Sequence, residues 1–131
     1  MMYAAPSRFG AARARYQNVD LSSRIEAASP HGLVAILFDE LLKALDAMAA
    51  AMAARDFGQR GTRQSRILSI LHGLEGSLDL DGGGDIAASL LGIYREARRL
   101  VLGAGRDNDP DQLARARAML AEIASAWESI A

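Results

Sequence analysis

The sequence predicts an all-α protein: an antiparallel four-helix bundle preceded by a partly ordered N-terminal arm. In four separate segments, apolar residues recur at alternating steps of three and four, which is the spacing of one helix face. Half of the residues are hydrophobic but only 5% are aromatic, and alanine, the strongest helix former, is abundant. Short connections join the segments, and such connections place neighbouring helices antiparallel.

Residues 1–28 are expected to form the arm, because they are poorly periodic and carry arginines among apolar side chains. The bundle is expected to span residues 29–131. Its first helix, over about residues 30–56, follows Ser29-Pro30, since serine is a good N-cap and proline fits the first helical turn. The apolar stripe of this helix comprises Val34, Phe38, Leu41, Leu45, Met48 and Met52.

The second helix is predicted over about residues 62–79, after Gly58 and Gly61, and three consecutive glycines at 82–84 follow it. Asp85 or Gly84 is expected to cap the third helix, over about residues 85–104. The core positions expected for these two helices are Ile67, Leu71, Leu74 and Leu78, and then Ile86, Leu90, Ile93, Ala97, Leu100 and Ala104.

Gly103, Gly105 and Asn108 are helix-stop residues and are expected to end the third helix. The last helix is predicted over about residues 110–130, with Asp109 as its N-cap and Gln112 as the partner in a capping box. Its core positions are Leu113, Ala116, Leu120, Ile123, Trp127 and Ile130.

Composition argues against several classes of function. The formal charge is −1, from 15 basic and 16 acidic residues, so the basic surplus typical of nucleic-acid binding is missing. Cysteine is absent, and two histidines are too few for a histidine-rich metal site. No apolar run approaches the ~18 residues of a membrane span, and no signal-peptide core follows Met1. We therefore expect a cytoplasmic protein without stable membrane insertion, nucleic acid, metal or cofactor.

No set of residues in the sequence suggests catalysis, so we expect a protein that is not an enzyme. The segment from Asp79 to Asp85 resembles the start of a calcium-binding loop, but the twelfth position, which needs a bidentate glutamate, is Leu90. The same glycines lack the preceding strand and the Gly-Lys-Ser/Thr of a phosphate-binding loop. His31 is expected to face solvent in the first helical turn.

His72 suggests an alternative function, phosphotransfer. It lies on the second helix of a predicted four-helix bundle, and this arrangement resembles that of histidine phosphotransfer domains. Those domains place Lys-Gly at the third and fourth positions after the histidine, whereas this chain has Glu75-Gly76. A carboxylate one helical turn from the phosphorylated ring would repel the phosphoryl group. Phosphotransfer through His72 is therefore the alternative hypothesis, and an ordinary helix histidine is the simpler interpretation.

A series of short motifs, in order along the whole chain, resembles the flagellin-specific export chaperones, the FliS family. Any one of these motifs is weak, but their order and spacing together are specific. They are Met2-Tyr3, Tyr16, Ala28-Ser29-Pro30, Leu37-Phe38-Asp39, Ser77-Leu78-Asp79, Gly83-Gly84-Asp85-Ile86-Ala87 with Leu90, Ile93-Tyr94, Asn108-Asp109 and Ala126-Trp127. Three positions depart from the family pattern: Glu96 replaces a tyrosine, Ser89 an asparagine, and Arg98 an apolar residue.

The resemblance implies a cytoplasmic chaperone that binds the C-terminal segment of flagellin, prevents its premature polymerisation and keeps it competent for the flagellar type III export apparatus. Its implied partners are flagellin, the flagellar export gate and, as further candidates, other flagellar regulators. The departures leave open whether the client is a standard or a divergent flagellin. An amphipathic client segment that is disordered alone can fold into an apolar groove.

Two sets of residues follow as site predictions. Leu91 is the most diagnostic of them, because it lies off the predicted core face: an exposed Leu91 would favour a binding surface and a fully buried one would favour core. The predicted flagellin-binding residues are Tyr16, Val19, Leu33, Leu37, Ile86, Leu90, Leu91, Ile93 and Tyr94. The arm is expected to act as a lid over the groove through Phe9, Tyr16, Val19 and Leu21.

Overall fold

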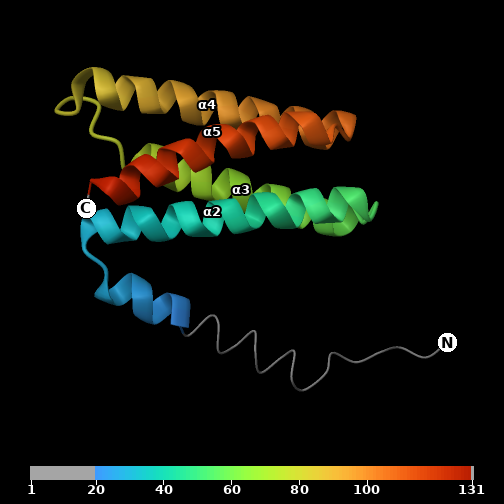
Figure 1. The fold of residues 1–131 in the computed structure, drawn as a ribbon, viewed down its shortest axis with the longest axis horizontal. Helices are drawn as coiled ribbons and strands as arrows, with labels where there is room; N and C mark the ends of the chain where they lie inside the picture. Colours follow the sequence, from blue (N-terminus) through green and yellow to red (C-terminus); the bar gives the residue numbers. More distant parts are fainter. Residues whose placement is uncertain (1–19, 131) are drawn as a thin grey trace.

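Four long helices run in alternating directions in the computed structural model, which describes residues 20–130 (Figure 1). They are α2 (Pro30–Ala53), α3 (Phe57–Gly76), α4 (Gly84–Asp107) and α5 (Pro110–Ser129). α2 packs against α3 and α5, and α4 packs against the same two helices, which makes a four-helix bundle. The predicted all-α bundle is confirmed.

A short helix over residues 20–27 precedes α2 and lies on the α2/α3 side of the bundle. Arg24 joins it to α2 through an ion pair with Asp39, at 3.4 Å. The lid residues Phe9, Tyr16 and Val19 lie outside the described residues, so the arm stays a prediction. Within residues 20–130, no helix has both the length and the apolar character needed to cross a membrane.

The core consists largely of the predicted stripes. Ser29 caps α2 by accepting a hydrogen bond from the Gly32 N–H (3.1 Å), and Pro30 occupies the first turn as expected. Each large apolar side chain that is fully buried contributes about 1.5–3 kcal/mol relative to an exposed one. The predicted core positions that are buried are Phe38, Leu41, Leu45, Met48, Met52, Ile67, Leu71, Leu74, Ala97, Leu100, Ala104, Leu113, Ala116 and Leu120.

α3 begins earlier than predicted, at Phe57, because the chain turns before the glycines. Arg55 takes a left-handed backbone conformation (φ 56°) directly after α2. Asp56 then caps α3 by accepting a hydrogen bond from the backbone N–H three residues later (3.1 Å). Gly58 and Gly61 therefore lie inside the helix, and the prediction that they precede it was wrong.

α4 continues through Gly103 and Gly105, so the prediction that these glycines end it was wrong. A Cβ atom on Gly103 would lie 2.1 Å from Oε1 of Gln112, and one on Gly105 would lie 2.1 Å from Oε1 of Gln64. The two glycines thus admit side chains from α5 and α3. Asn108, in the left-handed conformation (φ 49°), ends the helix as expected.

Asp109 caps α5 as predicted, but the capping box does not form. The Asp109 carboxylate accepts a hydrogen bond from the Asp111 N–H (3.0 Å). The side-chain amide of Gln112 donates to that same carboxylate (3.1 Å), while the Asp109 N–H donates to the Ala104 carbonyl (3.0 Å). The Ala104 carbonyl in the last turn of α4 therefore accepts the Asp109 N–H, which the Gln112 side chain would have accepted in a capping box.

The first half of α4 turns a different face to the core from the predicted one. Ala87 and Tyr94 are buried, whereas Ile86 is 76% exposed and Ile93 is only half-buried. The buried face therefore takes the residue after Ile86 and the residue after Ile93, while the predicted core positions Ala97, Leu100 and Ala104 are confirmed.

An ion pair links α2 to α5 at the surface. The guanidinium group of Arg117 donates two hydrogen bonds to the carboxylate of Asp46, at 2.6 and 3.2 Å. The hydrogen bond from Arg117 lowers the pKa of Asp46, and the small opposing effect of burial does not cancel it. The pair therefore stabilises the fold above the ordinary carboxylate pKa, and this contribution is lost as the pH falls through the lowered folded value.

We expect Asp46→Asn to lower the free energy of unfolding by about 0.5 kcal/mol at neutral pH, because exposed pairs contribute little. The difference from wild type should disappear in strong acid, where the carboxyl group is protonated in both folded and unfolded chains. Urea unfolding at several pH values in the acid range measures this difference in the free energy of unfolding. The Arg117→Gln variant and the double variant complete a double-mutant cycle for the ion pair. A difference that does not change with pH would contradict the assigned role.

Candidate functional site

The four helices do not all reach the same end of the bundle. α2 has 24 residues and α3 has 20, which at 1.5 Å per residue is a difference of about 6 Å. A three-residue turn joins α2 to α3 at one end, so the shortfall falls at the other. There α3 stops at Gly76, and the connection 77–83 runs across to α4 (Figure 1).

An apolar cavity of about 300 Å³ lies at this end, between α2, α4, α5 and the connection after α3. The side chains of Val34, Leu90, Tyr94 and Trp127 line it. The remaining lining residues are Ser77, Leu78, Asp79, Gly83, Ile86 and Ala87. Ile86, at the start of α4, is the most exposed large apolar side chain of the described residues and stands at the cavity.

Trp127 is fixed in place by His31. The indole N–H donates a hydrogen bond to the His31 carbonyl (3.0 Å), and the two rings stack with their centroids 4.4 Å apart. The prediction that His31 simply faces solvent was therefore wrong: its ring is half-buried against α5. This contact holds the end of α5 against the start of α2 and so sets one wall of the cavity.

Tyr94 forms the inner part of the cavity. It is only 3% exposed, and burial raises the pKa of its phenol, so the side chain stays neutral at physiological pH. A neutral, mostly apolar surface of this kind suits apolar side chains of a ligand rather than an ion.

The glycine-rich connection is a tight, hydrogen-bonded turn. Gly83 is the N-cap of α4 and makes no side-chain cap, so neither Asp85 nor Gly84 caps the helix as predicted. The Gly83 N–H donates to the Asp79 carbonyl (2.7 Å), and a Cβ atom there would lie 2.4 Å from that same oxygen. Gly84 follows with φ +57°, a conformation that favours glycine.

The rim of the cavity is acidic. Asp79 lines it, and Asp81 and Asp85 lie in the same connection and the first turn of α4. No lysine or arginine occurs between residues 77 and 94. Among residues 20–130, no group of three or more histidine and acidic side chains could hold a metal ion.

The structure brings together three of the predicted binding residues: Ile86, Leu90 and Tyr94. Leu91 and Ile93 are half-buried and do not line the cavity, so Leu91 is neither exposed nor fully buried. Of the other predicted binding residues, Leu33 is exposed and Leu37 packs against the core. Tyr16 and Val19 are outside the described residues. The predicted lid residue Leu21 lines a separate cavity with charged walls.

Seven lining residues were not among the predicted binding residues, and four of them have apolar side chains: Val34, Leu78, Ala87 and Trp127. Val34, Leu78 and Trp127 were predicted as core. Val34 and Trp127 stand near the ends of α2 and α5, and Leu78 lies just after the end of α3. A core position at the end of a bundle has no packed layer beyond it. The proximity of these residues to the predicted helix ends was the signal that could have marked them.

His72 does not have the surroundings of a phosphotransfer site. Its side chain is exposed on α3. Glu75, one turn further on, forms an ion pair of 2.8 Å with Arg98 of α4. The cationic residue that would offset a phosphoryl group is therefore replaced by an anion.

Comparisons with known proteins agree with the resemblance. The family model described as flagellar protein FliS matches residues 12–131. A flagellar secretion chaperone FliS from Vibrio cholerae is 33% identical over 115 residues, which cover 88% of this chain and 85% of that protein. The FliS of Salmonella typhimurium is 33% identical over 116 residues, covering 88% and 86% of the two chains.

A further relative, flagellar secretion chaperone FliSB of Pseudomonas aeruginosa, is 28% identical over 116 residues, covering 88% of this chain and 92% of the relative. These names describe chaperones rather than enzymes, and nothing in the comparisons supports the phosphotransfer alternative. With a family model that spans nearly the whole sequence and relatives of similar length, the chain belongs to the FliS family of flagellar secretion chaperones.

Proposed function

We propose that this chain binds the C-terminal segment of flagellin in the cytoplasm, prevents its premature polymerisation and delivers it to the flagellar export gate. The observation that supports this most directly is the apolar cavity at the open end of the bundle, with the exposed Ile86 beside it. In a family of secretion chaperones, a solvent-open apolar cavity is a natural place for an unfolded client to dock. The activity needs no metal, cofactor or catalytic residue.

The size of the cavity indicates how a client would be held. At about 300 Å³ it is at the lower limit of ligand pockets, so it accommodates side chains rather than a whole helix. An amphipathic segment would insert its apolar side chains between Val34, Leu90 and Trp127 and lay the rest of its length along the neighbouring surface. Its ordering costs part of the binding energy, which keeps the complex reversible.

The arm is proposed as a lid over the same cavity. Residues 1–19 carry Arg8, Arg13 and Arg15 and no acidic residue, while the residues that line the cavity include Asp79 and no lysine or arginine. An extended chain of this length reaches up to about 60 Å, which is ample to return to the cavity from residue 20. Phe9, Tyr16 and Val19 would supply the apolar contacts; Leu21 lines the charged cavity instead.

Ile86 offers the sharpest test. We expect Ile86→Asn to weaken binding of the flagellin C-terminal peptide by about tenfold or more, since burying an exposed isoleucine contributes about 1.5–3 kcal/mol. The melting temperature should not fall, because this side chain is already in solvent. Calorimetry measures the affinity, and the fluorescence of Trp127, the only tryptophan, reports occupancy of the cavity.

Leu102→Asn is the matched control, because Leu102 is an exposed aliphatic residue on the same helix near its other end. It should leave peptide affinity unchanged. Equal weakening by both substitutions would show that the cavity is not the docking site. Failure of wild type to form a stoichiometric complex with the peptide in gel filtration would overturn the proposed function itself.

Tyr16 tests the lid. Tyr16→Ala should raise peptide affinity by about fivefold, because less apolar contact must be displaced before the client binds. The melting temperature should change little, and Tyr16→Phe should behave like wild type. Unchanged affinity would remove Tyr16 from the site, and reduced affinity would identify it as a client contact instead of a cover.

A further inference from the structure

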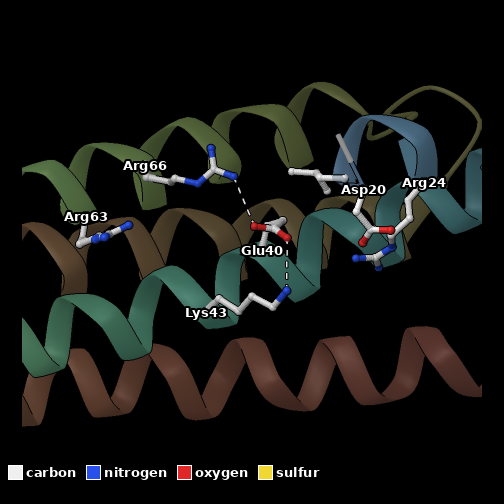
Figure 2. Close-up of a pocket in the computed structure, with 7 residues that line it drawn as sticks. Asp20, Arg24, Glu40, Lys43, Arg63 and Arg66 are labelled. Carbon is white, nitrogen blue, oxygen red and sulfur yellow. Dashed lines mark hydrogen bonds and ion pairs between the residues drawn. The ribbon is translucent and has the colours of Figure 1, made fainter. Parts of the chain in front are cut away.

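A second, charged groove lies along the junction of α2 and α3, bordered at one end by the helix at residues 20–27 (Figure 2). Two adjoining hollows form it, of about 690 and 270 Å³, and they share Glu40, Lys43, Arg63 and Arg66. None of the residues that line it also lines the apolar cavity. The two surfaces are therefore separate, although both use α2.

Cations outnumber anions in this groove. Lys43, Arg63 and Arg66 surround one carboxylate, that of Glu40, which Figure 2 shows between Arg66 and Lys43. Both of its ion pairs are long, at 3.4 Å to Arg66 and 3.5 Å to Lys43. Arg63 has no acidic partner within residues 20–130. These cations keep hydrogen-bonding capacity for another anion, since strong charge-assisted bonds are much shorter.

The groove also has apolar surface between its charges. Ala44 and Ala47 of α2 line one part, and Leu21 lines the other. Small side chains beside Lys43 of α2 and the two arginines of α3 let another backbone approach closely while its carboxylates reach these cations. We propose that this groove binds an acidic, amphipathic segment of a partner protein, with glutamates or aspartates toward Lys43, Arg63 and Arg66.

The chemistry favours a peptide over a nucleic acid. Glu40 stands in the middle of the groove and Asp20 at its end, where they would repel a continuous row of phosphates. A peptide can place carboxylates only where cations stand and apolar side chains over the alanines. The chain's own residues 1–19 do not suit the groove, because their charged side chains are all arginine.

The test uses a fluorescein-labelled peptide of about 20 residues, long enough to form a helix, with glutamates on one face and alanine and leucine on the other. Fluorescence anisotropy measures its binding to the full chain. We expect Arg63→Glu and Lys43→Glu each to weaken binding by about five- to tenfold. Wild-type affinity should also fall as salt is raised, because exposed charges are screened.

Arg115→Glu is the matched control: it makes the same change of charge at an exposed position of α5, on another face. It should leave the peptide affinity unchanged, and circular dichroism melts should show all three variants folded. Equal weakening by Arg115→Glu would show attraction by net charge alone and overturn the proposal. Equal binding of a peptide with glutamine at every glutamate would also overturn the proposal. So would tighter binding of an RNA oligonucleotide, or no binding of the acidic peptide at about 1 mM.

Discussion

The early end of α3 is the constraint on which the rest of the functional surface depends. After Gly76 no helix continues on the α3 side of this end, and the connection 77–83 borders the space there instead. Because a bundle buries apolar residues only where a neighbour faces them, the terminal positions of α2, α4 and α5 cannot all be covered. The cavity thus follows from the early end of α3, after which a connection rather than a helix borders the space.

Two local devices keep this opening defined rather than collapsed. Gly83 lets the backbone pass within contact of the Asp79 carbonyl, which fixes the path of the connection. Stacking of His31 on Trp127 holds the end of α5 against α2, where the bundle has no further layer to pack on. Aromatic pairs contribute about 0.5–1.5 kcal/mol beyond the area they bury, which is useful at a helix end. A wall formed this way is firm, yet it leaves apolar surface in contact with water.

The sequence was sufficient to predict the bundle, the Ser29 cap and the middle of each apolar stripe, because these depend on local periodicity and capping. It misplaced the glycines at 58, 61, 103 and 105, because a glycine does not by itself end a helix. At Gly103 and Gly105 the space left by the missing side chain is filled by Gln112 of α5 and Gln64 of α3. The sequence also could not separate cavity from core at Val34 and Trp127, because the pattern of a seam is the same whether or not another layer lies beyond it.

The three departures from the family pattern can now be placed against this geometry. Arg98 forms an ion pair with Glu75 between α4 and α3, Glu96 pairs with Arg99 along the surface of α4, and Ser89 is exposed. None of them lines the apolar cavity. Charge at position 98 is therefore satisfied by a neighbouring helix rather than offered to a client, and Glu75 serves the bundle instead of His72. The three departures therefore alter the surface outside the cavity and not its lining.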